Sequence, residues 1–224
     1  MRMGHAIGEA ERQRVAQAIR EGESKTSAEI VPVIARSSGR YDRPEDIVGL
    51  WLALVGILSV WFLLPSRAAK SGSWDTFGPS FEIVLLVAVT VVGFIVGAFL
   101  ATRIGWLRRL FTPHRQMREE VFARARQVFF DNRVYRTEGS TGVLLYISLY
   151  ERMAAVIADQ HVIDKLGQAE IDQICTEFTR QLAAGTPVDA LCETAVSLGG
   201  RLSGVLPRAA DDVNELSDAL VLLD

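Results

Sequence analysis

Two long hydrophobic runs interrupt a chain whose other segments mix polar and apolar positions. The first run covers residues 47–65 and the second covers residues 82–102. No charged residue occurs in the 18 positions from Ile47 to Leu64 or in the 20 positions from Ile83 to Thr102. A helix needs roughly 17 to 25 predominantly apolar residues to cross the hydrocarbon core of a bilayer. The two runs therefore predict a transmembrane helical hairpin over residues 47–102.

The segments on both sides of the hairpin have the periodicities of a soluble α/β domain. Apolar residues recur at helical spacing over residues 6–22, and a run rich in branched side chains predicts a strand from Ala28 to Ala35. Pro32 removes one ladder donor and favours an edge position or a bulge. After the hairpin, the patterns predict a helix, two strands that form an antiparallel hairpin, and two more helices, over residues 112–132, 142–149, 152–158, 168–184 and 187–203.

This order of elements predicts a three-layer α/β/α domain that the transmembrane hairpin interrupts. We expect the first strand to pair with the second. The domain's first part covers residues 1–46 and its second part covers residues 103–206, followed by an acidic tail over residues 207–224. The 168 residues outside the hairpin are enough for one domain with its own core.

Basic residues near the spans predict the orientation. Cytoplasmic flanks of membrane spans are normally enriched in Lys and Arg. The loop between the runs holds only Arg67 and Lys70, whereas eight arginines flank the outer ends, namely Arg36, Arg40, Arg43, Arg103, Arg108, Arg109, Arg115 and Arg118. We therefore expect two spans in the cytoplasmic (inner) membrane, with the N- and C-termini in the cytoplasm. Tryptophans in or beside the spans fit an interfacial position, namely Trp51, Trp61, Trp74 and Trp106.

Charge and cysteine content narrow the functional classes. A formal net charge of -3 argues against a general nucleic-acid binder. The two cysteines, Cys175 and Cys192, belong to no metal or redox spacing and each lies on an apolar helical face, so we interpret both as small core residues. The sequence also lacks a nucleophile elbow, a phosphate loop, a zinc-protease helix and a dinucleotide fingerprint.

Three segments, in the same order along the chain, resemble the TPM domain family. Thr-Glu-Gly-Ser-Thr-Gly-Val-Leu-Leu-Tyr-Ile-Ser-Leu-Tyr-Glu-Arg-Met-Ala-Ala-Val-Ile-Ala-Asp, at 137–159, is similar to that family's core. Ser-Ala-Glu-Ile-Val-Pro-Val, at 27–33, resembles its first strand, and Asn-Glu-Leu-Ser-Asp, at 214–218, resembles a tail found in its short members. The chain is thus identified as a membrane-inserted, short TPM-like protein.

The resemblance implies a phosphatase-like or calcium-binding domain, and relatives that assist the repair or assembly of membrane complexes. The better-known branch of the family has Asp-Asn-Gly before its second strand and a glycine-rich turn after its third. This chain has Ser140, Thr141 and Gly142 in the first place, and Ala158-Asp-Gln in the second. The loss of the family's carboxylate weakens the inference of both a metal and a phosphatase activity.

One replacement metal site follows from the expected strand order. If the first two strands are parallel neighbours and the third returns beside the second, then Glu29, Thr141 and Asp159 lie at the same sheet edge. Two carboxylates and a hydroxyl are ligands for a hard cation such as Ca²⁺, although Ca²⁺ takes six to eight oxygens. This edge is also opposite the one where open α/β sheets usually bind ligands. The alternative is that both carboxylates meet solvent or pair with Arg133 or Arg152.

Two further features suggest contacts with partners. Glu151 and Arg152 lie at the tip of the predicted strand hairpin, where they either face a partner or form a plain exposed turn. The acidic tail is either a short helix folded back on the domain or a peptide presented to a partner. Because the tail lies beyond the last predicted core helix, we expect a mobile segment.

Two functions remain open. The first is a non-catalytic, membrane-anchored TPM-like protein that binds other membrane proteins and assists their assembly or quality control. The second is a calcium-dependent phosphatase-like enzyme on the cytoplasmic face of the membrane. The first is favoured because no pair of nucleophile and base is identifiable and the acidic motif is altered. The lipid bilayer and other membrane proteins are the expected partners.

Overall fold

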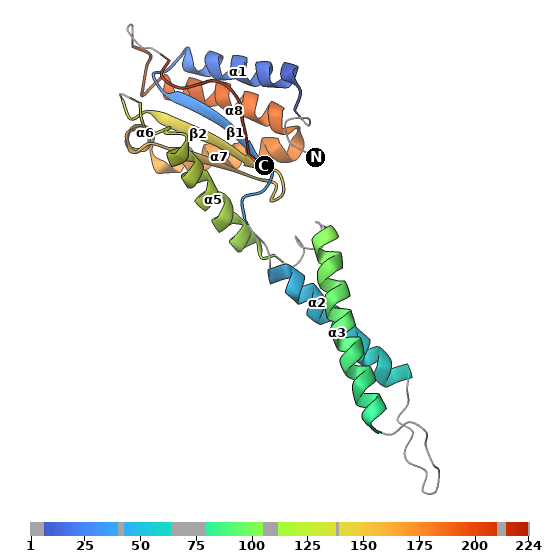
Figure 1. The fold of residues 1–224 in the computed structure, drawn as a ribbon. Coiled ribbons are helices and arrows are strands. Elements are labelled where there is room, and N and C mark those ends of the chain that lie inside the picture. The colour runs from blue at the N-terminus through green and yellow to red at the C-terminus, as the bar shows by residue number, and fades with distance from the viewer. Residues whose placement is uncertain are drawn as a thin grey trace, which may run out of the picture. The chain divides into compact units, whose positions relative to one another are not determined.

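The computed structural model describes residues 7–39, 43–63, 79–104, 112–137, 139–209 and 214–223. The chain divides into two compact units. One unit consists of Met1–Gly39 together with Arg115–Asp224, and the other is Arg40–His114. The first unit holds the α/β domain and the second holds the two long apolar helices (Figure 1).

A four-stranded mixed sheet forms the centre of the α/β unit. Its order is β3-β2-β1-β4, with bounds β1 (Glu29–Ala35), β2 (Gly142–Ser148), β3 (Met153–Ala158) and β4 (Val221–Leu223). β1 pairs with β2 and with β4 in parallel, and β2 pairs with β3 in antiparallel fashion. The predicted pairing of the first two strands and the predicted antiparallel hairpin are therefore confirmed.

Helices cover both faces of this sheet, because its strands are apolar on both faces (Figure 1). On β2, Val143, Leu145 and Ile147 pack towards α1, α7 and α8, whereas Leu144 and Tyr146 pack towards α5. The α/β class and the three layers are thus observed. The helices of this unit are α1 (Glu9–Glu23), α5 (His114–Asp131), α6 (Gln160–Leu166), α7 (Gln168–Ala184) and α8 (Pro187–Leu202).

Two glycines allow α1 and α8 to approach each other closely. A Cβ atom added to Gly199 would lie 2.3 Å from the Gly22 carbonyl oxygen, and one added to Gly22 would lie 2.6 Å from the Ala195 carbonyl oxygen. Neither backbone oxygen can move aside as a flexible side chain would. Glycine is therefore required at this crossing, which brings the end of α1 against the sheet.

The acidic tail ends in a short strand of the sheet, so the expectation of a mobile segment is wrong for its described part, residues 214–223. β4 pairs with β1 from Val33 to Ala35, and Leu220 is buried beside it. Pro32 lies immediately before this pairing begins, which explains how a strand with a proline is central along its last three residues. Tertiary pairing supplies the order that the polar tail sequence does not indicate.

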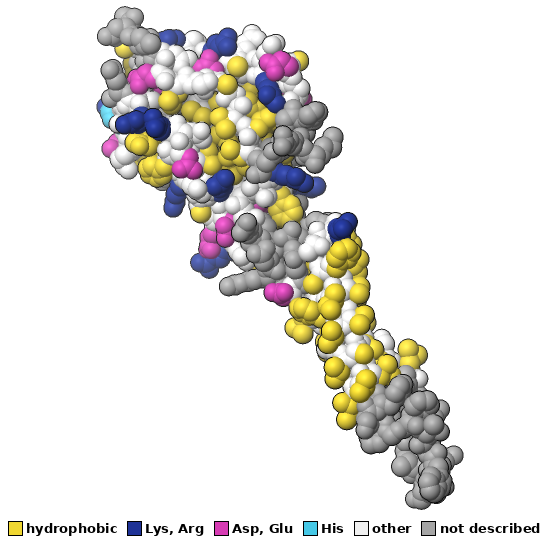
Figure 2. All heavy atoms as spheres, in the orientation of Figure 1, with side chains coloured by type: hydrophobic (Ala, Val, Ile, Leu, Met, Phe, Trp, Pro, Cys, Tyr) yellow, Lys and Arg dark blue, Asp and Glu magenta, His cyan; other side chains and the backbone are white. Residues whose placement is uncertain are grey.

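The other unit consists of two antiparallel helices, α2 (Arg43–Leu63) and α3 (Pro79–Arg103). Close approaches pair Gly49 with Gly97 and Gly56 with Val89, so residue numbers rise along one helix while they fall along the other. Only 11% of Asp46–Leu63 and 6% of Ile83–Arg103 is buried. Hydrophobic side chains make up much of the described surface of both helices on the face that Figure 2 shows. Both helices are long and apolar enough to cross a membrane.

Several residues used for the predicted orientation lie outside the described residues. They include Arg67, Lys70 and Trp74 of the predicted loop, together with Arg40, Trp106, Arg108 and Arg109. Residues 64 and 65 of the first predicted span also lie outside them. The orientation of the hairpin in a membrane therefore stays a prediction.

Candidate functional site

The register of the sheet places Glu29, Thr141 and Asp159 at the same edge, namely the one where β1 and β2 begin and β3 ends, as the predicted strand order requires. Glu29 pairs with Gly142, which directly follows Thr141, and Asp159 directly follows β3. β2 lies between β1 and β3. Two strand spacings separate the backbones of the two acidic residues, roughly 10 Å across the sheet. The two carboxylates therefore belong to the same edge without being on neighbouring strands.

Glu29 is buried, and its carboxylate holds the C-terminal tail. Oε1 accepts the backbone N–H of Glu215 at 3.2 Å, and Oε2 accepts that of Leu216 at 3.3 Å. A carboxylate that accepts backbone N–H groups is a strong, charge-assisted anchor. Glu29 thus fixes the chain just before it enters β4.

Thr141 and Asp159 have separate surroundings. The Thr141 hydroxyl donates to the Ser27 carbonyl at 2.9 Å. Asp159 occupies the N-cap position of α6, but its side chain makes no capping hydrogen bond there. Its buried Oδ2 has no hydrogen-bond partner among the described residues, and burial raises the pKa of this carboxyl above its usual value.

The arrangement does not provide the ligand set that Ca²⁺ needs. Both oxygens of Glu29 already accept backbone N–H groups, and Asp159 lies beyond the intervening strand. Within the described residues, no three His, Cys, Asp or Glu side chains are grouped so as to hold a metal ion. Calcium binding by Glu29, Thr141 and Asp159 stays a prediction to which the geometry adds no support.

A second buried carboxylate near this edge was not identified from the sequence. Glu23, the last residue of α1, is 9% exposed, and its Oε1 accepts the Ile30 N–H at 2.9 Å. That N–H lies on the side of β1 where β4 pairs, but at a position before Val33, where the pairing with β4 begins. Burial raises the pKa of Glu23 to about 8, and the negative charges of Glu29 and Asp218 add to the effect. Glu23 therefore binds a proton near neutral pH.

The prediction of a solvent-facing pair at the strand turn is wrong for Glu151, which is 0% exposed. Its carboxylate accepts the backbone N–H groups of Ser38, at 2.9 Å, and Gly39, at 3.3 Å, as well as the Ser148 hydroxyl. The turn directs the side chain over the ends of β1 and β2, where these donors need an acceptor. Glu151 thus fixes the segment that follows β1 and is not available to a partner.

Arg152 is exposed and adopts a φ of 54°, in the left-handed region. This conformation reverses the chain between β2 and β3. Binding of a partner through Arg152 alone stays a prediction.

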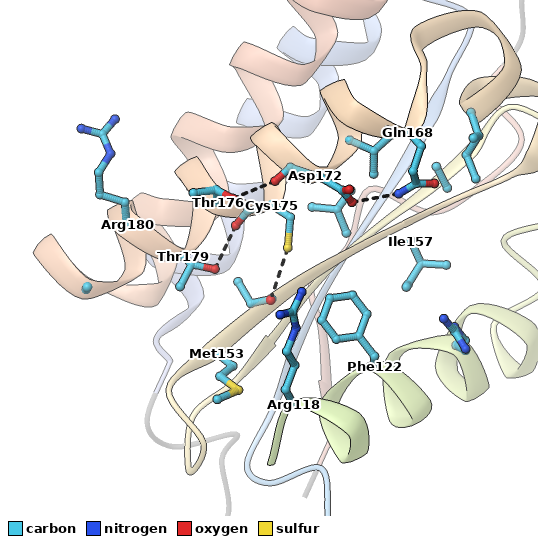
Figure 3. A pocket seen from close by; sticks show the side chains of 17 residues that line it. Arg118, Phe122, Met153, Ile157, Gln168, Asp172, Cys175, Thr176, Thr179 and Arg180 are labelled. Carbon is cyan, nitrogen blue, oxygen red and sulfur yellow. Dashed lines mark hydrogen bonds between the residues drawn. The ribbon is translucent and has the colours of Figure 1, made fainter. Parts of the chain in front are cut away.

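A groove of about 810 Å³ lies along the outer edge of β3, between α5 and α7 (Figure 3). α5 contributes Arg118, Phe122 and Arg126, and β3 forms the floor. The side chains from α7 are mostly polar, namely Asp172, Cys175, Thr176, Thr179 and Arg180. The groove lies entirely within the α/β unit.

The floor of the groove is the unpaired edge of the sheet. Within the described residues, no strand lies beyond β3. The Asp159 N–H donates to the Gly142 carbonyl at 2.9 Å, towards β2. Because backbone groups alternate between the two sides of an antiparallel strand, Ala154, Val156 and Ala158 direct theirs away from β2.

Cys175 covers part of this edge. Its thiol donates to the Ala154 carbonyl at 3.6 Å, in the direction expected for an outward-facing group (Figure 3). Burial raises the pKa of the Cys175 thiol, while a hydrogen bond from the Val156 backbone acts in the opposite direction. The thiol thus contacts two outward-facing residues of β3 and stays protonated near neutral pH.

The groove is positively charged. Arg118, Arg126 and Arg180 are exposed, and none of them forms an ion pair with a carboxylate of the described residues. The Arg118 guanidinium instead lies 5.6 Å from the centre of the Phe122 ring. Asp172, the acidic residue of the lining, accepts a hydrogen bond from a neighbouring glutamine at 2.9 Å. The site is therefore suited to a ligand that carries negative charge.

Sequence reasoning missed this groove because no local motif marks it. Arg118 and Arg126 are eight residues apart on α5, which is close to two helical turns. This spacing was the only feature of the sequence that pointed to the groove. The site depends on which strand is outermost. In an antiparallel hairpin packed against a sheet, either of the two strands can take that position. Only the sheet order shows that β3 is the edge strand.

No protein-family model and no curated protein matches the chain. Among solved structures, the chain is similar in fold to the NMR structure of BA42 protein from the psychrophilic bacterium Bizionia argentinensis. The TM-score is 0.57 and the sequence identity is 16%, and the match covers 96% of this chain and 94% of BA42. At that identity the match supports an α/β fold shared with BA42.

Proposed function

We propose that this chain is a membrane-anchored, non-catalytic protein-binding module. In this proposal, a TPM-like α/β domain is held at the cytoplasmic face of the inner membrane by a two-helix hairpin, and it assists the assembly or quality control of membrane proteins. The observation that carries the proposal is the open, positively charged groove along the unpaired edge of β3.

The exposed surface of α2 and α3 supports the membrane anchor. Helices in the core of a soluble protein are buried, whereas large apolar side chains stand out on these two, including Trp61 at 70% exposure and Ile83 at 62%. Apolar helix surface of this kind is stable in lipid and costly in water. The arginines that flank the outer ends of the runs support a cytoplasmic domain.

The hydrogen bonds of the buried carboxylates and the pKa of the Cys175 thiol support binding over catalysis. Glu29 and Glu151 use their oxygens to hold backbone N–H groups, which are structural tasks. The raised pKa of Cys175 disfavours the thiolate, which is the nucleophilic form. The phosphatase alternative gains no specific observation from these groups.

Membrane insertion and orientation are tested in intact cells. We expect the full chain to stay in the membrane fraction after alkaline extraction. A single cysteine introduced as Ser71→Cys, in a Cys175→Ser and Cys192→Ser background, should react with an impermeant thiol reagent added from outside the inner membrane. Release by alkali would refute the anchor, and labelling only from the cytoplasmic side would refute the orientation.

Binding through the groove is tested by photocrosslinking in the same membranes. A photoreactive residue at exposed Thr176, within the groove, should form an adduct with another protein, and this adduct should be lost in Arg126→Glu. The control position is Gln17, which is exposed on α1 outside the groove lining. Equal adducts from both positions, or none from Thr176, would count against the proposed function.

A further inference from the structure

We infer that the groove binds an acidic, extended segment of a partner protein, which adds as a fifth strand to the free edge of β3. This inference rests on the proposed function and specifies the partner's chemistry. Addition of an extended peptide to an exposed sheet edge is an established mode of recognition, in which backbone hydrogen bonds supply affinity and side chains supply specificity.

The backbone of β3 provides the template. Ala154, Val156 and Ala158 direct their N–H and C=O groups into the groove, at intervals of two residues. Ala154 and Val156 are only 5% and 4% exposed, so side chains from α5 and α7, Cys175 among them, must move aside before a strand can pair here. Unpaired strand edges bind other chains readily, and proteins normally cover or charge them. Here α5 and α7 flank the edge and leave a channel of about 810 Å³ between them.

The charges on both walls select an acidic segment. Side chains of an added strand alternate between the two sheet faces. One set of side chains would face Arg118 and Arg126 on α5, and the other would face Arg180 on α7. Because these arginines have no carboxylate partner among the described residues, acidic side chains on either face of the segment gain ion pairs.

The spacing of the arginines sets the pattern of the segment. Arg118 and Arg126 are eight residues apart, about 12 Å along a helix. Residues four apart on a strand are separated by about 13 Å and lie on the same face. Acidic residues at that interval therefore match both arginines. An apolar residue between them meets Phe122 and Ile157, which lie in the same groove.

Cys175 provides a way to measure binding. The added strand must replace the thiol at the Ala154 carbonyl, and a thiol is a weak hydrogen-bond donor. A stronger backbone N–H donor then takes its place. Because the segment covers this part of the groove, a bound peptide should protect Cys175 from alkylation.

The direct test uses a labelled synthetic peptide and the full chain in nanodiscs of phosphatidylcholine. The probe is Ac-Thr-Glu-Val-Val-Val-Glu-Val-Thr-amide, whose two glutamates are four residues apart. We expect saturable binding that weakens with added salt, together with protection of Cys175 in a Cys192→Ser background. A lysine version of the probe should not bind, and a version N-methylated at alternate amides, which cannot donate to β3, should bind at least about tenfold more weakly.

Charge reversal on α5 tests the location. Arg126→Glu should weaken binding of the acidic probe by about tenfold. Arg124→Glu changes the net charge equally on the same helix, outside the groove lining, and should change binding by less than about twofold. Hydrogen-exchange patterns of β1 and β2 in both variants check that the domain stays folded.

Several results would overturn the inference. They are no binding of the acidic probe, equal binding of the N-methylated probe, equal effects of Arg124→Glu and Arg126→Glu, and crosslinks at Thr176 that join two copies of this chain. If the probe fails while Thr176 still forms a groove-dependent adduct with another protein, the inference of an acidic strand is wrong and the proposed function stands. If both fail, the proposed function fails with it.

Discussion

The buried carboxyl group of Glu23 predicts a pH-dependent stability that a single substitution should remove. Its pKa rises from a usual value of 4.5 to about 8, first because of burial and then because of the charges on Glu29 and Asp218. Between these two pH values, the folded state keeps a proton that the unfolded state has released. The contribution to stability is therefore complete below about pH 4.5 and is lost as the pH rises through about 8.

The size of the effect follows from the same two values. The difference between 4.5 and about 8, at about 1.4 kcal/mol for each pKa unit, sets an upper limit of about 5 kcal/mol. Local opening that admits water to the end of α1 reduces the penalty, so we expect a loss on the order of 3 kcal/mol between pH 5 and pH 8.5. Glu23→Gln keeps a carbonyl acceptor for the Ile30 N–H and cannot ionise.

Amide hydrogen exchange of the full chain in detergent micelles, measured by mass spectrometry, checks this prediction. Peptides from β1 and β2 report the free energy of opening of the domain, after correction for the intrinsic pH dependence of exchange. We expect the native chain and Glu23→Gln to be nearly equal near pH 5, and Glu23→Gln to be the more stable near pH 8.5. Glu21→Gln is the matched control, because Glu21 is exposed on the same helix.

The reasoning is refuted if the difference between the native chain and Glu23→Gln is the same at both pH values. It is also refuted if Glu21→Gln produces the same gain near pH 8.5. Either result would mean that Glu23 is ionised in the folded domain at little cost.

Three further substitutions test the packing of the domain. Gly199→Ala places a methyl group 2.3 Å from a backbone oxygen of α1 and should destabilise the domain by at least about 2 kcal/mol in urea unfolding. Gly200→Ala is the control: a Cβ atom there has nothing within 4 Å, so the stability should stay unchanged or rise. Glu151→Ala leaves buried donors without an acceptor and should cost about 3 kcal/mol in urea unfolding, against less than about 0.5 kcal/mol for Arg152→Ala; equal costs would contradict the assigned role. Glu29→Ala releases the tail and should speed hydrogen exchange in residues 214–223 more than in β2; unchanged exchange there would show that β4 pairing alone holds the tail.

Much of the fold was predictable because it depends on local patterns. Strands that are apolar on both faces and helices with a single apolar face fixed the α/β class, and a run of branched residues marked β1. The tail escaped prediction since β4 is only three residues long and its partner, β1, is nearly two hundred positions earlier in the sequence. A strand of that length has no sequence signal apart from its pairing.

The candidate sites likewise divide into features that local patterns predict and features that depend on tertiary contacts. Strand order was enough to place Glu29, Thr141 and Asp159 at one edge, but not to show that backbone N–H groups already occupy Glu29. The turn position of Glu151 suggested exposure, whereas its side chain is fully buried beneath the segment after β1. Side-chain burial depends on neighbours distant in the chain, which a linear pattern does not contain.

The sequence by itself determined two things about this protein: a pair of helices long and apolar enough for a membrane, and an α/β domain divided by them. Both follow from hydrophobicity and its period, which are properties of contiguous residues. Only the tertiary structure decided that β3 is the outermost strand, that Arg118, Arg126 and Arg180 line one groove beside it, and that the end of the acidic tail pairs with part of the opposite edge, at Val33–Ala35 of β1. These features arise where elements distant in the chain meet, so their chemistry depends on the order of strands in the sheet.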